Sequence, residues 1–395
     1  MSTKAQKAKF FAIQTNHGSI VRPPNGDTVS LPGVSALLTQ QMYRILLRSA
    51  AALIVAAVFW NLVISLTTLR LPKIERDGPF GPHYQPNSLH VHGSEGFAWI
   101  RHDEFGFNNP SGAIANRGNE SERTIVVLGD SFTEALQVPR PLNFCSLLED
   151  QLESSTVINL GMSGRSMCDA LMFSDSLRER LEPDRVIVQC RIDDWLEDAT
   201  NPVKDFFITP SDSEFSIVSN DSETQALKLK KDQFISIAPF IGWSYLRIRS
   251  LGLSKNSFLP GNLKPKKKVA VSKETTVRPE IAPEFKNLID WQISELIDRY
   301  GNQLLTILYI DEISIPAGLT ETPADSPLES YLFAACQEAG IDVLRTREAF
   351  LDALRNEHSP PTGFANSVPG RGHLNRIGHQ KVSALLSRYL KTLNL

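Results

Sequence analysis

Near its N-terminus the chain has one long run of residues without charge, from Ser49 to Leu69. A run of about twenty apolar residues is what a helix needs to cross the hydrocarbon core of a bilayer. The run is apolar on every side, whereas a helix that packs on a soluble core has one apolar stripe. The pattern therefore predicts a single transmembrane helix over residues 49–69.

The residues before this run are basic. Against one acid, Asp27, they carry Lys4, Lys7, Lys9, Arg22, Arg44 and Arg48. Because basic flanks stay in the cytoplasm, we expect residues 1–48 to form a flexible cytoplasmic tail and the main domain to be extracytoplasmic. A cleaved signal peptide is the alternative, but the tail is too long for one and no A-x-A-like site follows the run.

Residues 70–120 are rich in Gly, Pro, Asn and His, as in GPFGPHYQPNS and DEFGFNNPSG. Such a composition is typical of turns and linkers, so we expect an extended approach from the membrane to the main domain. His90, His92 and His102 lie in this segment without acidic partners at ligand spacing, and no metal site is expected there.

From Thr124 onward, short apolar runs alternate with segments of helical period, which is typical of βαβ units. The strands are expected at 124–129, 156–161, 185–190, 304–310 and 341–345, and the helices at 141–153, 169–181, 284–300, 327–338 and 376–391. The prediction is an α/β domain over residues 121–395, with three α/β/α layers and a five-stranded parallel sheet of flavodoxin-like type. Residues 200–283 break the alternation and are expected to be an insertion, whose basic cluster at 264–268 we interpret as a solvated loop.

Composition narrows the classes of partner. The formal net charge of -3 gives no basic field that would draw the chain to nucleic acid, so a small molecule or a glycan is the expected partner. The four cysteines are scattered without metal-ligand spacing, and we expect buried free thiols, no metal and no cofactor. The oligomeric state stays open.

The residues that carry chemistry begin with Gly-Asp-Ser-Phe-Thr-Glu at 129–134, directly after the first apolar strand. Ligands of an open parallel sheet bind outside the carboxyl ends of its strands, so Ser131 is placed where a substrate would lie. The structural alternative is a turn in which Asp130 and Ser131 cap the next helix.

Together with three later segments, this motif resembles the four blocks of the SGNH (GDSL-type) hydrolase superfamily. The later segments are Asn-Leu-Gly-Met-Ser-Gly at 159–164, Arg-Ile-Asp-Asp-Trp at 191–195 and Gly-His-Leu-Asn at 372–375. The resemblance covers residues 121–200 and 300–395. It implies that Ser131 is the nucleophile, His373 the base, and Gly164 and Asp193 the positions of the oxyanion hole.

Two positions depart from the family pattern. Asp193 stands where the family has an oxyanion-donating asparagine, and an ionised carboxylate accepts hydrogen bonds instead of donating them. The acid that orients the histidine is missing, because Gly370 and Arg371 occupy its usual place. Asp311, at the end of the fourth strand, is the candidate surrogate acid.

The leading hypothesis is an extracytoplasmic serine esterase or acyltransferase that acts on O-acyl esters, with acetyl groups of a surface or exported polysaccharide implied by the resemblance. The alternative is a catalytically degenerate SGNH domain that binds a glycan or a protein partner; the two departures favour it, and intact Ser131, Gly164 and His373 oppose it. A membrane scaffold that uses the 200–283 insertion for assembly is a third hypothesis.

Overall fold

The computed structural model describes residues 32–66, 74–93, 95–114, 123–200, 206–211, 214–219, 281–313 and 324–395. The chain divides into two compact units, Met1–Ala57 and Val58–Leu395. The basic cluster at 264–268 lies outside the described residues.

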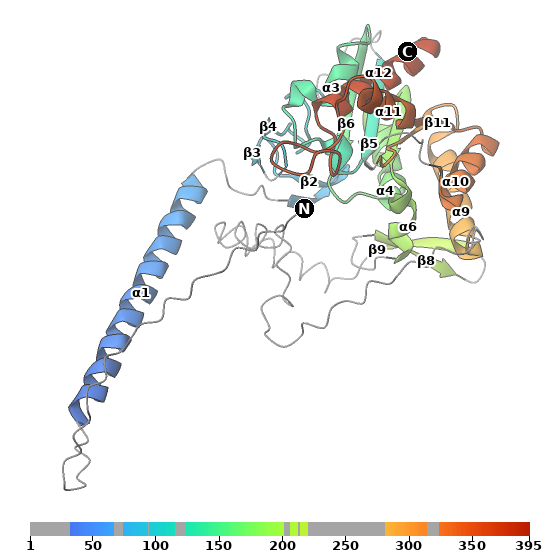
Figure 1. The fold of residues 1–395 in the computed structure, drawn as a ribbon. Coiled ribbons are helices and arrows are strands. Elements are labelled where there is room, and N and C mark those ends of the chain that lie inside the picture. Colours follow the sequence, from blue (N-terminus) through green and yellow to red (C-terminus); the bar gives the residue numbers. More distant parts are fainter. Residues whose placement is uncertain are drawn as a thin grey trace, which may run out of the picture. The chain divides into compact units, whose positions relative to one another are not determined.

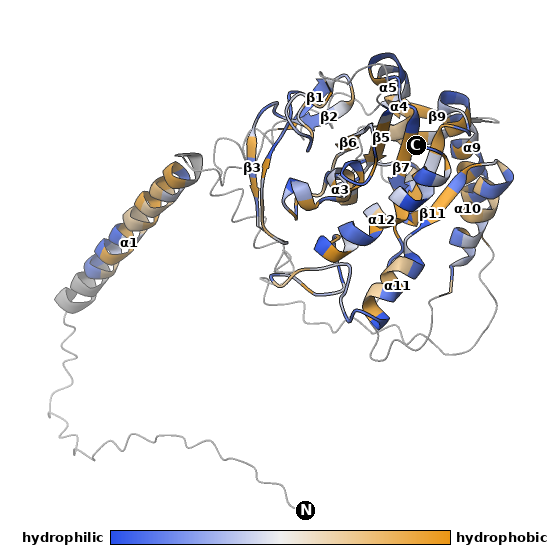
Figure 2. Ribbon diagram, turned by 90° about the horizontal axis from the view of Figure 1, so that it is seen from above, coloured by the Kyte–Doolittle hydropathy of each residue, from blue (hydrophilic) through white to orange (hydrophobic). Residues whose placement is uncertain are grey.

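The helix α1 spans Pro32–Leu66, and its Gln40–Val63 part is long and apolar enough to cross a membrane. Figure 2 shows this part of the helix largely in the colour of apolar residues. The helix begins at Pro32, before the predicted start at Ser49. The uncharged run begins only after Arg48, but the helical hydrogen bonding extends further toward the N-terminus and includes Arg44 and Arg48. Long basic side chains tolerate such a position because their stems can lie along the apolar region while the charge reaches the headgroups.

The centre of the second unit is a five-stranded parallel sheet. Its strands lie in the order β11-β10-β7-β5-β6. Their bounds are Arg123–Gly129 for β5, Ser155–Gly161 for β6, Arg185–Cys190 for β7, Leu305–Tyr309 for β10 and Asp342–Arg345 for β11. In chain order this is 2-1-3-4-5, so the predicted flavodoxin-like sheet is confirmed, with each strand within one residue of its expected bounds.

Helices cover both faces of the sheet and complete three layers (Figures 1 and 2). Alternate residues of a strand point to opposite faces, so Ile125 and Val127 belong to one core while Val126 and Leu128 belong to the other. The first core is shared with α3 (Phe144–Glu149), α11 (Arg347–Arg355) and α12 (Arg376–Thr392). The second is shared with α4 (Met167–Met172), α5 (Ser174–Leu181), α9 (Pro283–Tyr300) and α10 (Pro327–Glu338). Each such fully buried aliphatic side chain contributes about 1.5–3 kcal/mol.

The segment expected to be a linker is partly folded. It forms two antiparallel hairpins, β1 (Ile74–Gly78) with β2 (Gly81–Tyr84) and β3 (Leu89–His92) with β4 (Ala98–Arg101). Phe80 and Phe107 are buried in the second core, the one that contains Val126 and Leu128, and Ile100 is fully buried in a smaller cluster. The Gly and Pro content of this segment marks tight turns of a packed structure, and the folded unit therefore includes residues well before 121.

Shorter elements complete the unit. They are α2 (Ser131–Glu134), a 3-10 helix at Arg140–Leu142, α6 (Ile192–Thr200), and the hairpin of β8 (Phe206–Ser211) and β9 (Glu214–Ser219). This hairpin belongs to the predicted insertion, and its Ile208 packs against Cys168 and Leu288. All four cysteines are free and buried, as expected from their spacing.

Candidate active site

Ser131 is the first residue of α2, directly beyond the carboxyl end of β5. Asp130 caps this short helix, and its Oδ1 accepts a hydrogen bond of 2.9 Å from the backbone N–H of Phe132. Two strand-end glycines let the turn approach the sheet, because a Cβ at Gly129 would meet Thr133 and one at Gly161 would meet the backbone of α2. Capping and catalysis are therefore not exclusive interpretations of the motif, since the cap holds the serine at the sheet edge.

His373 lies in the loop that leads into α12 and faces Ser131. Its Nε2 is 2.8 Å from Ser131 Oγ. The loop is fixed by Asn375, which caps α12 through its Oδ1 and donates from Nδ2 to the carbonyls of Pro360 and Gly363. The two residues for which the sequence predicts nucleophile and base are thus brought together from positions 242 residues apart.

The second ring nitrogen of His373 is held by an acid that the sequence did not indicate, Glu95. Glu95 Oε2 is 2.6 Å from His373 Nδ1, and Glu95 Oε1 accepts from the backbone N–H of His373 at 3.1 Å. A carboxylate accepts hydrogen bonds only, so Nδ1 carries the proton and Nε2 accepts from the serine hydroxyl. This tautomer is the one that a general base needs.

The turn between β3 and β4 carries Glu95 and is clamped to the histidine loop. Asn366 accepts from the backbone N–H of Gly96 at 2.8 Å and donates to the carbonyl of Gly96 at 2.9 Å. Gly96 has a φ of +69°, and a Cβ there would meet the carbonyl of Gln137. Gly372 has a φ of +90°, and a Cβ there would meet the Glu95 carboxylate. Both glycines are therefore required for the acid to reach the imidazole.

Two effects oppose each other on the pKa of Glu95. Partial burial favours the neutral acid, but the hydrogen bonds and the charge of His373 outweigh it, and the pKa of Glu95 lies below its usual value. The Glu95 side chain is 16% exposed and the His373 side chain 30%. The pair is thus shielded from bulk water on the acid's side while the base stays accessible.

The hairpin that carries Glu95 could have been predicted from its sequence pattern. The residues of β3, Leu-His-Val-His, alternate between apolar and polar, those of β4, Ala-Trp-Ile-Arg, alternate in burial, and the turn between the strands contains Gly93 and Gly96. That alternation predicts a hairpin with Glu95 at its tip. It does not predict the contact with His373, which is 278 residues away.

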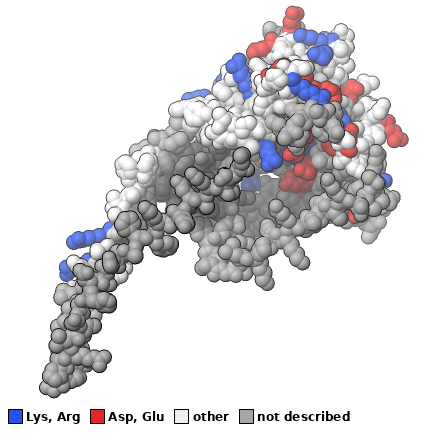
Figure 3. All heavy atoms as spheres, viewed as in Figure 1, with Lys and Arg blue, Asp and Glu red and all other residues white. Residues whose placement is uncertain are grey.

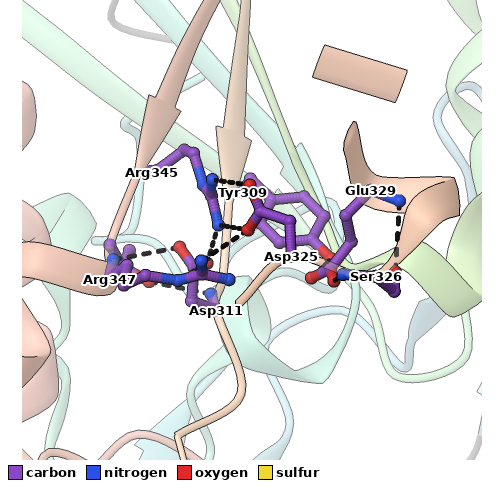
Figure 4. A network of polar contacts seen from close by, with 8 residues as sticks. Tyr309, Asp311, Asp325, Ser326, Glu329, Arg345 and Arg347 are labelled. Atoms are coloured by element: carbon purple, nitrogen blue, oxygen red, sulfur yellow. Dashed lines mark hydrogen bonds and ion pairs between the residues drawn. The ribbon is translucent and has the colours of Figure 1, made fainter. Parts of the chain in front are cut away.

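Asp311 does not take the role of surrogate acid. It lies just beyond β10, as the sequence predicts, but its carboxylate binds Arg345 at 2.5 Å and Arg347 at 3.0 Å. Arg347 also donates to it from the backbone at 2.9 Å, and Asp325 joins the same ion-pair network (Figure 4). The Asp311 side chain is 1% exposed, and two guanidinium groups compensate its charge. The surrogate prediction is therefore wrong: Asp311 binds the start of α11, and Glu95 binds the histidine.

Asp193 does not lie at the expected oxyanion position either. It is in the first turn of α6, its side chain is 75% exposed, and it is 3.7 Å from Arg191 Nη2. Arg191, in contrast, contacts the site: its guanidinium lies over the ring of Phe132 at 5.8 Å and donates to Glu312 at 3.0 Å. Arg191 thus lines the pocket that contains Ser131, and Asp193 is not among its lining residues.

Gly164 lies in the turn after β6, with a φ of +84° that favours glycine. The neighbouring Ser163 donates its hydroxyl to Glu134, the last residue of α2. Burial raises the pKa of Glu134, although hydrogen bonds from Ser163 and Tyr84 act in the opposite direction. These bonds join the Gly164 turn to the helix that carries Ser131.

A pocket of about 190 Å³ opens beside the serine and histidine. Its lining residues come from the carboxyl ends of β5, β7 and β10 and from the histidine loop, and they are Asp130, Ser131, Phe132, Arg191, Ile310, Asp311, Glu312, Ile313, Thr362, Gly370, Arg371, Gly372 and His373. A substrate at this place would meet the candidate nucleophile at the edge of the sheet where ligands of this topology bind.

Comparisons with known proteins give likenesses of fold. No family model matches the chain, and no curated protein does. Among solved structures it is similar to the esterase EstA of Pseudoalteromonas sp., at 16% identity and a TM-score of 0.35, over 69% of this chain and 100% of that one. A lipolytic G-D-S-L family protein of Veillonella parvula is 11% identical, with a TM-score of 0.34, over 68% of this chain and 98% of that one. An acetylxylan esterase of Geobacillus stearothermophilus is 13% identical, with a TM-score of 0.33, over 68% and 94% of the two chains.

Proposed function

We propose that this chain is a serine esterase or acyltransferase for O-acyl esters, with Ser131 as nucleophile, His373 as base and Glu95 as the orienting acid. One observation carries the proposal: the hydrogen bonds Ser131 Oγ to His373 Nε2, at 2.8 Å, and His373 Nδ1 to Glu95 Oε2, at 2.6 Å, form a continuous chain. A serine hydroxyl is a weak nucleophile until a base removes its proton, and this arrangement supplies that base in the correct tautomer.

In the first half-reaction, Ser131 Oγ attacks the acyl carbon while its proton moves to His373 Nε2. The carbonyl oxygen becomes an oxyanion, which backbone N–H groups of Ser131, at the start of α2, and of Gly164 stabilise. The tetrahedral intermediate then expels the alcohol, which takes the proton from Nε2, and the acyl group stays on Ser131. Glu95 remains ionised throughout and stabilises the imidazolium that forms between the two proton transfers.

In the second half-reaction, His373 takes a proton from a water molecule or from another alcohol, and that oxygen attacks the acyl carbon. Water gives hydrolysis, and an acceptor hydroxyl gives transfer. Both outcomes regenerate Ser131 with its proton, so the same residues serve an esterase and an acyltransferase. The acceptor determines which of the two reactions occurs.

The degenerate binding domain remains the competing function, and the site geometry favours the enzyme. The missing acid was one of two reasons for the alternative, and Glu95 supplies that acid from another segment. The other reason was Asp193, whose carboxylate is exposed and is not among the residues that line the pocket. A carboxylate turned to solvent does not repel an oxyanion strongly.

We further propose that the domain acts outside the cytoplasm, on acyl groups of a surface or exported polysaccharide. The location is supported by Arg44 and Arg48, which precede the uncharged run of α1 that begins at Ser49; Figure 3 shows basic side chains near the N-terminal part of the described helix and no acidic ones along it. The polysaccharide is an analogy with the acetylxylan esterase among the similar structures.

The test uses the full chain in detergent with a fluorophosphonate probe and an aryl acetate, beside Ser131→Ala. We expect labelling and acetate release by the natural chain and loss of both in the variant. A folded natural chain that neither reacts with the probe nor releases acetate contradicts the esterase proposal. A second assay with an added polyol acceptor separates transfer from hydrolysis.

A further inference from the structure

We propose that the pocket beside Ser131 selects esters that carry a negatively charged group, a carboxylate above all, and that Arg371 and Arg191 bind this group. The inference rests on the proposed esterase function and names the substrate class of that site. It is based on a comparison of the charged residues that line the pocket. Some of their charges are already compensated by protein partners, and others are available to a ligand.

The carboxylates of the pocket lining are engaged. Asp311 is bound by Arg345 and Arg347, which makes a compensated network together with Asp325. Asp130 is turned to the backbone N–H of Phe132 as the cap of α2. Glu312 binds Arg191 at 3.0 Å. Asp311 is thus compensated by two arginines, Glu312 is paired with Arg191, and Asp130 is held as the cap of α2.

Arg371 is different. It lines the pocket and is exposed, and within the described part of the chain its guanidinium forms no ion pair or hydrogen bond. It also stands two residues before His373, where the family resemblance places an acid. Since Glu95 supplies that acid from the β3–β4 turn, position 371 presents the opposite charge at the pocket.

Arg191 gives a second cation in the pocket lining, just beyond the carboxyl end of β7. Its side chain is 29% exposed, its guanidinium lies over Phe132, and its acidic partners Glu312 and Asp193 have side chains that are 78% and 75% exposed. Both of these contacts are made by Nη2, so the other N–H donors of the guanidinium can bind a substrate carboxylate while Glu312 keeps its partner. A guanidinium has five N–H donors in a planar fork, which suits bidentate binding of a carboxylate.

The test measures selectivity between matched esters with the full chain in detergent. One pair differs on the acyl side, 4-nitrophenyl hydrogen succinate against 4-nitrophenyl butyrate. The other differs on the alcohol side, a monoacetylated methyl glucuronoside against the same ester of methyl glucoside. We expect a higher kcat/KM for the charged member of at least one pair, and the responding pair tells which side of the ester carries the anion.

Arg371→Gln should lower that charged-to-neutral ratio by about 10- to 100-fold, the range of a hydrogen-bonded ionic contact. Arg191→Gln should lower it as well, and Arg371→Lys should restore part of it. Arg388→Gln, which removes the same charge from an exposed position of α12, is the matched control and should leave the ratio unchanged.

Binding separates this inference from the esterase proposal. In the Ser131→Ala chain, a glucuronate oligomer should bind more tightly than the matched glucose oligomer, and Arg371→Gln should abolish the difference. This readout holds even where no turnover occurs. Turnover of neutral esters with no preference for either charged ester, together with equal binding of the two oligomers, overturns the inference and leaves the esterase intact.

Discussion

Replacing Glu95 by Gln tests the central contact of the site. The substitution keeps the shape of the side chain and removes its negative charge, so Nδ1 of His373 loses its fixed proton acceptor. A glutamine amide can also donate to Nδ1, which favours the tautomer that cannot accept from Ser131. We expect kcat to fall while KM changes little, because the ester itself does not contact Glu95.

The magnitude follows from the geometry. With Oε2 at 2.6 Å from Nδ1 and only 16% of the side chain exposed, the carboxylate is weakly screened. At about 4 Å between charge centres and an effective dielectric constant of about 20, it stabilises an imidazolium by about 4 kcal/mol. That energy corresponds to about a 10³-fold change in rate, and loss of the tautomer raises the expected effect toward about 10⁴-fold, as in the serine-protease triad.

The assay compares initial rates of aryl acetate hydrolysis and of fluorophosphonate labelling in the natural chain and in Glu95→Gln. Glu153→Gln makes the same chemical change at an exposed carboxylate outside the site and is the control. A Glu95→Gln chain that melts normally and keeps more than about a third of the natural kcat refutes the assignment of the orienting acid, because the charge contribution above would then be absent.

Three further results are expected. Asp311→Asn should lower the free energy of unfolding by about 3 kcal/mol, seen in denaturant titration, because Arg345 and Arg347 lose a nearly buried partner, and its effect on kcat should be smaller than that of Glu95→Gln. Asp193→Ala should change kcat/KM for a neutral aryl acetate less than about twofold, because its side chain is 75% exposed; a loss of a hundredfold would return it to the oxyanion site. Burial, and then the nearby His373, lower the pKa of His379 to about 3. In the unfolded chain the pKa of a histidine is about 6.5, so the stability that neutral His379 contributes is complete above that pH and is lost as the pH falls toward 3. We therefore expect His379→Gln to reduce the slope of the unfolding free energy against pH by about 1.4 kcal/mol per pH unit between pH 6 and 4.

The parallel sheet was predictable because its strands are covered on both faces. The residues of β10, Leu-Thr-Ile-Leu-Tyr, are all buried, and such strands appear in a sequence as short, mostly apolar runs. The chain order of the strands then limits the topology, since parallel neighbours need a crossover helix. Ser131 and His373 were predictable for the same reason, because each lies at a fixed place relative to these elements.

The acid was not predictable from the same pattern, because local spacing does not specify a contact between a hairpin tip and a distant loop. The N-terminal hairpins are short and only half buried, and their Gly, Pro and His content is also that of a linker. Asp311 was the closest acid by strand order, and its position beyond β10 was right. The two arginines that compensate it follow β10 in the chain at β11 and α11, and their pairing becomes visible only in three dimensions.

The relocated acid explains two neighbouring residues of the histidine loop together. Gly372 must lack a side chain because the Glu95 carboxylate occupies the space where its Cβ would project. Position 371, next to it, does not have to carry the acid, because Glu95 contacts His373, and Arg371 lines the pocket with a positive charge. An acid at 371 would place a second carboxylate beside the His373–Glu95 pair and would repel an anionic substrate. An acid that comes from the N-terminal hairpin therefore allows the same loop to place an imidazole and a cation beside one pocket, which an acid at position 371 would prevent.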